Sequence, residues 1–502
     1  MKPCFAFLIL IIITGCTMNQ SKSLGVFESA SDVGPIQLAG GSYYDPATGH
    51  YRLKGAGDNM WFGKDAFHFL WKKTSGDFIL DADVEWIGRG NHEHRKAGLS
   101  IRETLDSGSR HVSAEYHAGD GLMSMQYRME PDSMTLEQSS RDRHLSVMRL
   151  EKRGNIIQMF ACKPGDLLQQ VGEIELPFDS TSFYLGLFVC SHDSNTVEEA
   201  IFKNVRLTVP AKPDFIPYQD YIGCRLEILD IESGSRKIIY ESQTPFEAPN
   251  WSPDGSFLVV NSQGKLYRIP PEGGALTEID TDFATSNNND HGFSPDGKML
   301  ALSHHAQDRP AGRNSIIYTV PVEGGVPTQI TENSPSYWHG WSPDGKTLIY
   351  TANRSDQWDL YSIPAKGGNE FQLTNNPGLD DGSEFSSDGT HIWFNSNRTG
   401  TMEIWRMNAD GSDPVQITDD PSQNWFPHQS PDGKCLIYLA YPPEVDPWDH
   451  PYYKQVTLRL IRLKDMSSEV MAYLYGGQGT INVPSWSPDS RRVAFVSNSD
   501  GL

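Results

Sequence analysis

Three histidines and one glutamate recur at the same place in a repeated turn motif. The two residues that precede the aromatic position of each copy include His291, His339, Glu384 and His428. The chain has 15 histidines in 502 residues, so chance would place fewer than one among these positions. Imidazole nitrogens with a carboxylate oxygen suit Mn, Zn or Fe. The pattern therefore predicts a divalent transition metal site, and the alternative is a hydrated channel whose histidines bond to water and loop carbonyls.

More polar and aromatic residues fall in the segments that would surround such a site. They lie in loops between repeats or at the ends of second strands, where ligand contacts are often placed. We expect a ligand to contact Trp338, Asp381, Asn395, Arg398, Trp425, His450 and Gln478. Asp290, His304, His305 and Asp380 lie in the same segments. Two longer loops, 446–454 and 476–482, could line the same place.

The turn motif repeats at intervals typical of a β-propeller. In each copy an aromatic residue would pack between blades, and Pro-Asp-Gly makes a tight turn in which glycine accepts a positive φ. The copies are Trp251-Ser-Pro-Asp-Gly255, Phe293-Ser-Pro-Asp-Gly297, Trp341-Ser-Pro-Asp-Gly345, Phe385-Ser-Ser-Asp-Gly389, Ser430-Pro-Asp-Gly433 and Trp486-Ser-Pro-Asp-Ser490. They follow one another at 42, 48, 44, 44 and 57 residues, which is the length of a four-stranded blade.

The last copy lacks its two outer strands, because the sequence ends shortly after the strand-like segment 492–498. Two strand-like segments without a partner, 225–231 and 237–242, precede the first copy. We therefore expect the ring to close with strands from both ends, which gives six blades and leaves no free edge.

The repeats resemble the WD40-like (PD40) repeats of TolB and its relatives over residues 220–502. This resemblance implies a six-bladed propeller. It implies little about activity, because propellers of this kind serve as hydrolases, lyases, peptidase gates and binding proteins.

The N-terminal half is predicted to be a separate β-sandwich over residues 26–210, followed by a proline-rich linker over 211–219. The strand-like segments 96–102, 111–116 and 148–153 resemble the concanavalin-type jelly rolls of the DUF1349 family. The whole chain is therefore expected to be all-β. Cys162 and Cys190 lie in neighbouring strand-like segments and could pair. Sandwiches of this kind often bind carbohydrate, and Trp61, Trp71, Tyr116 and Tyr127 could stack on sugar rings, although core packing explains each of them equally well.

The N-terminus resembles a bacterial lipoprotein signal. Lys2 precedes the apolar run 5–13, and Ile13-Thr-Gly-Cys16 has the form of a lipobox. The signal peptide would then be residues 1–15, Cys16 would carry the lipid, and residues 16–25 would form a tether. Thr17 after the cysteine favours the outer membrane, by resemblance to enterobacterial lipoproteins. The net charge of −22 argues against nucleic acid as a partner.

These features lead to two hypotheses about function. The first is a cell-envelope lipoprotein that binds and processes an acidic oligosaccharide or polysaccharide. In outline it resembles the oligogalacturonate lyases, propellers with a histidine-rich manganese site. That resemblance implies a metal-dependent polysaccharide lyase, with His305 or Lys454 as the catalytic base. The second is a non-catalytic scaffold that binds envelope proteins, as TolB does. Only the first hypothesis involves turnover.

Overall fold

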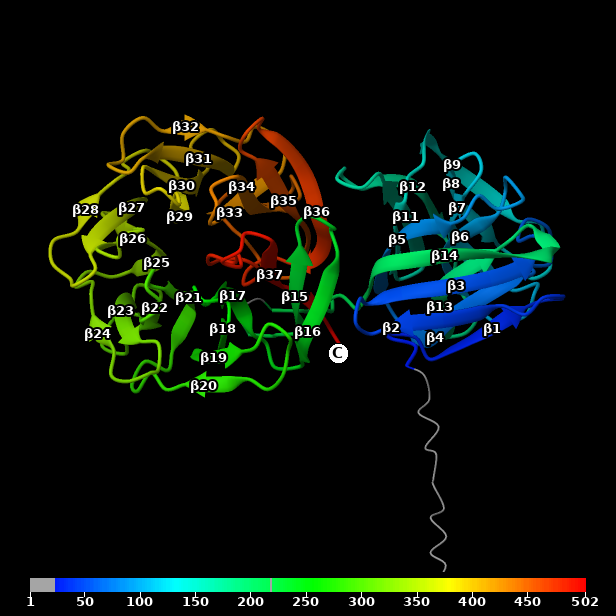
Figure 1. The fold of residues 1–502 in the computed structure, drawn as a ribbon, viewed down its shortest axis with the longest axis horizontal. Coiled ribbons are helices and arrows are strands. Elements are labelled where there is room, and N and C mark those ends of the chain that lie inside the picture. Colours follow the sequence, from blue (N-terminus) through cyan, green and yellow to red (C-terminus); the bar gives the residue numbers. More distant parts are fainter. Residues whose placement is uncertain (1–22, 217–218) are drawn as a thin grey trace, which may run out of the picture.

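The computed structural model describes residues 23–216 and 219–502. In this part of the chain every regular element is a β-strand, and no helix is long and apolar enough to cross a bilayer. Figure 1 shows two bodies side by side, a ring of blades and a pair of stacked sheets. The all-β prediction is therefore confirmed. The predicted signal peptide, Cys16 and residues 16–22 of the tether lie outside the described residues.

The first body consists of two antiparallel sheets of seven strands each. One sheet contains, in spatial order, β1 (Ser29–Val33), β4 (Phe67–Ser75), β13 (Ser182–Cys190), β6 (Lys96–Arg102), β7 (His111–His117), β8 (Leu122–Arg128) and β9 (Leu136–Arg143). The other contains β12 (Gln169–Glu175), β11 (Ile156–Cys162), β10 (Val147–Arg153), β5 (Phe78–Ile87), β14 (Asp193–Thr208), β3 (His50–Gly57) and β2 (Gly41–Asp45).

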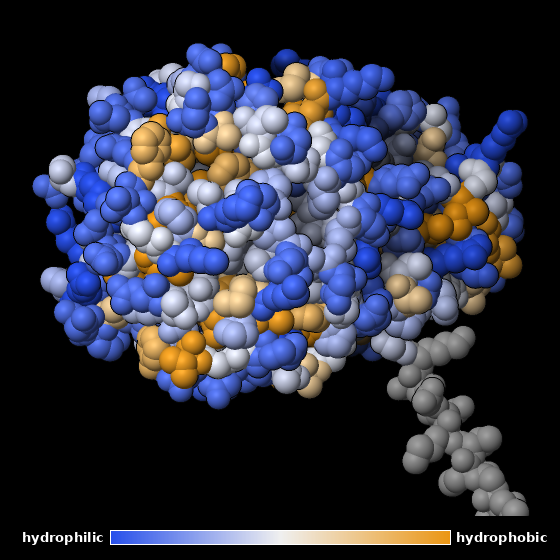
Figure 2. All heavy atoms as spheres, turned by 60° about the vertical axis from the view of Figure 1, so that its left-hand side comes forward, coloured by the Kyte–Doolittle hydropathy of each residue, from blue (hydrophilic) through white to orange (hydrophobic). Residues whose placement is uncertain are grey.

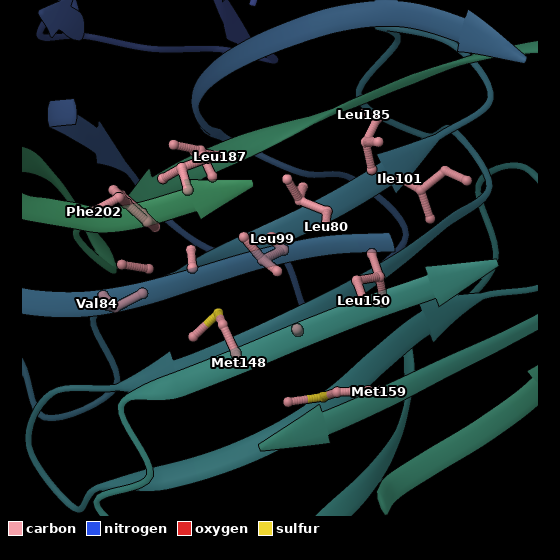
Figure 3. Packing of buried hydrophobic residues seen from close by; sticks show 14 of the residues in the cluster. Leu80, Val84, Leu99, Ile101, Met148, Leu150, Met159, Leu185, Leu187 and Phe202 are labelled. Atoms are coloured by element: carbon pink, nitrogen blue, oxygen red, sulfur yellow. The ribbon is translucent and has the colours of Figure 1, made fainter. Parts of the chain in front are cut away.

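The two sheets share one hydrophobic core (Figure 3). Leu80 is opposite Leu150 in the second sheet, and Leu99 is opposite Leu187 in the first. All four side chains are fully buried, so each sheet places an apolar face against the other. The resemblance to concanavalin-type jelly rolls stays a prediction. The suggested pairing of Cys162 with Cys190 is wrong, because both are free thiols, and Cys162 lies 3.0 Å from the hydroxyl of Tyr473.

The second body is a ring of six sheets, as the repeat predicts. Five of them have four strands, listed from the innermost outward. They are β17 (Glu247–Trp251), β18 (Leu258–Ser262), β19 (Lys265–Ile269) and β20 (Thr277–Ile279); β21 (Asn287–Phe293), β22 (Met299–His305), β23 (Ser315–Pro321) and β24 (Thr328–Gln329); β25 (Ser336–Trp341), β26 (Thr347–Arg354), β27 (Gln357–Pro364) and β28 (Phe371–Gln372); β29 (Asp380–Phe385), β30 (His391–Ser396), β31 (Glu403–Asn408) and β32 (Val415–Gln416); β33 (Gln423–Gln429), β34 (Cys435–Tyr441), β35 (Lys454–Arg462) and β36 (Ser467–Gly476).

The sixth sheet joins the two ends of the propeller. Strand β37 (Arg492–Ser499) pairs with β15 (Gly223–Asp230), which pairs with β16 (Arg236–Ser242). A single bridge between Trp486 and Val493 stands in place of the innermost strand. The predicted closure with strands from both ends is therefore confirmed, with the inner strand reduced to that bridge.

The repeated turn is held by one hydrogen bond that recurs in all six copies. The serine hydroxyl donates to the aspartate two residues later, at 2.5 to 2.7 Å. The next residue has a positive φ in every copy, and it is glycine in all but the last, where Ser490 has a φ of 60°. The motif is thus a local turn that starts the second strand of each blade.

The outer rim of the ring is largely hydrophilic in the view of Figure 2, where hydrophobic residues form only small separate groups. Val326, Phe371 and Val415 are exposed in or beside the outer strands of three successive blades. Isolated apolar residues of this kind are normal on a soluble surface.

The two bodies are joined by a buried charge network. The carboxylate of Glu227 on β15 accepts hydrogen bonds from Arg236 on β16 and from Arg206 on β14, at 2.9 and 2.7 Å. Burial alone would raise the pKa of Glu227, but these two guanidinium groups hold it below its usual value. Because both partners are needed to balance the buried carboxylate, the two bodies are expected to stay in a fixed relation.

Candidate functional site

A cavity of about 880 Å³ opens at one end of the propeller ring. It lies where the inner strands begin, and loops between blades surround it. Its lining residues are Tyr221, Gln243, Thr244, Pro245, Glu247, Asn261, Ser262, Gln263, Gly264, Asn287, Asn288, Asn289, Asp290, His305, Tyr337, His339, Thr351, Trp358, Leu379, Asp381, Phe426, Trp448, His450, Tyr452, Gln478 and Asn482. We call this the mouth cavity.

A β-bulge interrupts each of the five inner strands close to the mouth cavity. The pairing with the second strand shifts between Glu247 and Asn250 in β17, and between Asp381 and Glu384 in β29. The same irregularity occurs in β21, β25 and β33. Bulges redirect side chains and are common beside functional sites. Here they separate the residues that face the cavity from those that follow along the same strand.

An ion pair between His339 and Asp381 forms one wall of the mouth cavity. The Nε2 atom of His339 lies 2.8 Å from Oδ1 of Asp381, and the hydroxyl of Thr351 donates to the same oxygen at 2.7 Å. Burial opposes ionisation of both groups, but each favours the charged form of the other. The pKa of Asp381 is lowered to about 2 and that of His339 is raised. His450 lies 4.0 Å from the other carboxylate oxygen.

Two further carboxyl groups in the cavity hold their protons to higher pH. Burial raises the pKa of Asp290 to about 6, with Asp381 adding to the shift, although Asn288 donates to its carboxylate at 2.6 Å. Burial also raises the pKa of Glu247 to about 7, even though Tyr452 and Asn289 each donate to it at 3.0 Å. The cavity thus combines an ionised carboxylate with two that exchange protons near neutral pH, which is the arrangement that acid and base chemistry requires.

The rest of the lining consists mainly of amides and aromatic rings. Trp448 is 58% exposed on the loop between β34 and β35, and Trp358 and Tyr337 are less exposed, both on the blade of β25 to β28. Among the described residues that line the mouth cavity there is no Lys or Arg. A ligand would therefore meet flat apolar rings, amides and carboxylates, with no permanent cation.

The four predicted metal ligands do not form one ligand set. Both ring nitrogens of His291 face backbone carbonyls, those of Asn289 and Val259, at 3.0 and 3.4 Å. The ring of His428 bonds to Glu384 at 2.6 Å and to the carbonyl of Ile481, and only His339 lines the cavity. The metal shared by these four residues stays a prediction, and in this structure the three imidazoles have separate partners.

The other predicted residues divide into two groups. Asp290, His305, Asp381, His450 and Gln478 line the mouth cavity. The remaining ones are structural or lie elsewhere: Trp338 and Trp425 are buried, Asn395 accepts from the backbone of Phe426, Arg398 forms an ion pair with Asp380, and His304 accepts from the backbone of Ser286. Lys454 is exposed beside a second cavity, with Glu444, Asp446 and Asp449, so it is not brought together with His305. The sandwich aromatics Tyr116, Tyr127 and Trp71 pack against hydrophobic cores.

Glu247, Asn289 and Tyr337 line the cavity but were not among the predicted residues, and Asn482 lies in the predicted loop 476–482. Together with Asp381, these residues stand four positions before the aromatic residue of their repeat, and all five line the mouth cavity. Only Trp425 breaks the pattern, and its neighbour Phe426 takes the place in the lining. The repeat therefore contained the signal at the fourth position before the aromatic residue. The prediction had used the two positions directly before the aromatic residue instead.

Comparison with known proteins places the propeller in a family. The model of the TolB β-propeller domain matches residues 333–444. An uncharacterized protein of Agrobacterium fabrum is 44% identical over 272 residues, which are 54% of this chain and 91% of the relative. The solved structure of a "putative TolB" from Agrobacterium tumefaciens is 42% identical and has a TM-score of 0.53; the match covers 56% of this chain and 99% of that one.

A more distant likeness is to an oligogalacturonate lyase in complex with manganese, at 15% identity and a TM-score of 0.39 over 55% of this chain and 83% of that one. A score this low supports no argument about ligand or metal. The high identity to the Agrobacterium proteins over nearly their whole length is the informative match. Through its propeller, this chain belongs to the family of TolB-like β-propeller proteins.

Proposed function

We propose that this protein binds carbohydrate in the mouth cavity of its propeller, as a component of the cell envelope. The observation that carries the proposal is the lining, in which amides, carboxylates and aromatic rings surround a cavity of about 880 Å³. Amide and carboxyl groups accept and donate the hydrogen bonds that sugar hydroxyls offer, and exposed rings such as Trp448 can cover the apolar face of a sugar.

The charge of the lining favours a neutral sugar or an amino sugar over the acidic one suggested by the sequence. A uronate carboxylate would find His339 already paired with Asp381, and no Lys or Arg among the described lining residues. An ammonium group, in contrast, would gain from the ionised Asp381. The carboxyl groups of Glu247 and Asp290 could transfer a proton to or from a bound sugar, so the site also has groups suitable for turnover.

The envelope location rests on the lipobox that ends at Cys16, outside the described residues. The predictions of a lipid anchor and of the outer membrane belong to this proposal and are tested together by metabolic labelling with a radioactive fatty acid and by fractionation. Replacement of Cys16 by Ser is expected to abolish labelling.

Calorimetric titration of the purified chain with neutral, amino and uronic oligosaccharides tests the binding site. We expect binding of one of the first two classes, weakened about tenfold or more by Asp381→Asn. The matched control is Glu384→Gln, the same kind of change on the same strand β29 but outside the cavity lining; its affinity should stay within about twofold of the unmodified protein. The proposal fails if no class binds, or if both variants lose affinity equally.

A second candidate function, a scaffold that binds a protein segment at the same mouth, is favoured by the similarity to a "putative TolB". It predicts that no oligosaccharide binds, while a partner protein captured from envelope extracts is lost with Asp381→Asn and kept with Glu384→Gln.

A further inference from the structure

A cluster of histidines lies at one end of the first body, outside the propeller. His92 and His94 are in the loop between β5 and β6, His117 ends β7, and His192 is in the turn between β13 and β14. Strand β6 pairs with both β7 and β13, so that Lys96 is opposite His117 on one side and Cys190 on the other. This topology brings three separate segments together. The ring of His94 lies 5.6 Å from that of His117 and 5.7 Å from that of His192, between centroids.

Three side chains of the cluster have the spacing of metal ligands. His94, His117 and Asp120 each offer one ligand atom, and these atoms lie within 4.8 Å of one another. Among the described residues no other group of three or more His, Cys, Asp or Glu side chains meets this condition. The Nδ1 atom of His117 is 3.8 Å from Oδ1 of Asp120, which is too long for a hydrogen bond. Two ligands on a tetrahedral zinc ion would lie about 3.4 Å apart, given metal bonds of about 2.0 to 2.1 Å.

His117 is buried without a hydrogen-bond partner. Its side chain is only 7% exposed, and the nearest carboxylate oxygens, those of Asp120 and Glu115, lie 3.8 and 4.0 Å from its two ring nitrogens, too far for a hydrogen bond. The Nδ1 atom of His192 is buried without a partner as well. Buried polar atoms are nearly always satisfied, so an imidazole with two unpaired nitrogens facing a carboxylate and another imidazole indicates a missing ligand.

The surroundings are compatible with a cation. The nearby ammonium of Lys96 is neutralised by Glu115, at 2.9 Å. Asp120 is accessible at the edge of the cluster, with a side chain 39% exposed, so an ion could enter from solvent. His92 is less suited to bind the ion, because its Nδ1 accepts a hydrogen bond from the backbone of His94 at 3.1 Å.

We propose that His94, His117 and Asp120 bind one divalent transition-metal ion. Two imidazoles with one carboxylate form a set of borderline and hard donors that suits zinc, with water completing the coordination. The ion would tie together the loop before β6 and the end of β7, and would stabilise the folded chain by binding to it alone.

Zinc binding to the untagged, chelator-treated chain tests the site, measured by calorimetry and by metal analysis after gel filtration. We expect one equivalent of zinc, and an affinity about tenfold or more lower in His94→Gln and in Asp120→Asn. Both replaced side chains are partly exposed, so these variants should fold. The matched control is His50→Gln on β3 of the same body, outside the cluster, whose affinity should equal that of the unmodified chain.

Cobalt(II) provides a second readout that depends on ligand geometry. The unmodified chain should give visible absorption bands of a four-coordinate complex, and His94→Gln should lose them. Zinc should also raise the melting temperature of the unmodified chain more than that of a variant that carries both His94→Gln and Asp120→Asn. Absence of zinc binding, or equal binding by the cluster variants and the control, overturns the proposal.

Discussion

The mouth cavity and the stretch of the inner strands just beyond it are built from the same repeats but have opposite chemistry. At the mouth, Asp290 and Glu247 keep carboxyl groups whose pKa values are raised toward neutrality. Beyond the bulges, His291 and His428 have their ring nitrogens occupied by carbonyls or by Glu384. The bulge therefore separates residues that can contact a ligand from buried residues whose hydrogen-bonding groups already have partners within the protein.

This comparison shows that equal repeat positions need not have equal roles. His291 and His339 both stand two residues before the aromatic residue of their repeats, but only His339 lines the cavity. The difference comes from the partner that the neighbouring blade offers, which is Asp381 for His339 and the carbonyl of Val259 for His291.

The largest effect of a single substitution is expected on the free energy of unfolding, at Glu384, which follows the bulge of β29. Glu384→Ala removes the carboxylate that bonds to His428 and leaves a buried imidazole with one partner fewer. We expect the free energy of unfolding to fall by about 2 kcal/mol, measured by urea denaturation. Glu384→Gln keeps a hydrogen-bond acceptor, so its free energy of unfolding should fall by less. If the binding free energy for an oligosaccharide fell by as much as the free energy of unfolding, Glu384 would also contribute to the binding site. The distinction between the mouth cavity and the buried residues beyond the bulges would then be wrong.

The next effect concerns the ion pair at the mouth. Asp381→Asn removes the charge that favours the imidazolium of His339, so the pKa of that ring should fall. Nuclear magnetic resonance of ¹⁵N-labelled histidine measures the titration. An unchanged titration of His339 would mean that Asp381 does not set its charge.

A smaller effect is expected from Trp448→Ala. The ring is 58% exposed, so its loss should leave the melting temperature unchanged, while the affinity for a sugar falls by about 1 kcal/mol or roughly fivefold. Phe371→Ala is the matched control, an exposed aromatic ring of β28 outside the cavity lining. Equal affinities of the two variants would remove Trp448 from the binding surface.

The last effect is on the pH dependence of stability. The pKa values of Glu247 and Asp290 rise on folding, from 4.5 to about 7 and from 3.8 to about 6. The folded chain therefore holds protons that the unfolded chain has lost, and the contribution of these groups to stability decreases as pH rises from about 4 to 7. Glu247→Gln should flatten this slope in urea denaturation between pH 5 and 7.5. A slope identical to that of the unmodified chain would contradict the raised pKa.

The propeller was predictable because its signal is local and repeated. Each Ser-Pro-Asp-Gly turn is held by a hydrogen bond between residues two positions apart, such as Ser252 and Asp254, so the sequence alone carries it. The closure by β37 and β15 followed from counting strands. The candidate site was predicted only in part, since the bulges that aim Glu247 and Asp381 at the cavity depend on pairing between strands.

The histidine cluster of the first body gave no sequence signal for the same reason. His94, His117 and His192 come from three segments that share no motif and meet only through the order of strands β13, β6 and β7. A motif that occurs six times can be recognised in the sequence even when each copy is weak. A site that is formed once, from segments far apart in the sequence, has no motif by which it could be recognised.

The sheet that closes the ring, in which β37 pairs with β15, also determines when the cavity can form. Ser497 on β37 donates to Glu227, a partner 270 residues earlier, and Val496 donates to the carbonyl of Thr480 at 3.1 Å, in the loop that carries Gln478 and Asn482. During synthesis or export, one edge of β15 would therefore stay unpaired until β37 has emerged. The pairing of β37 would then complete three things in one late step: the ring, the charge network between the two bodies, and the last wall of the cavity. A nascent chain would have no binding site until that step, and its exposed edge would be the place where a chaperone is most useful.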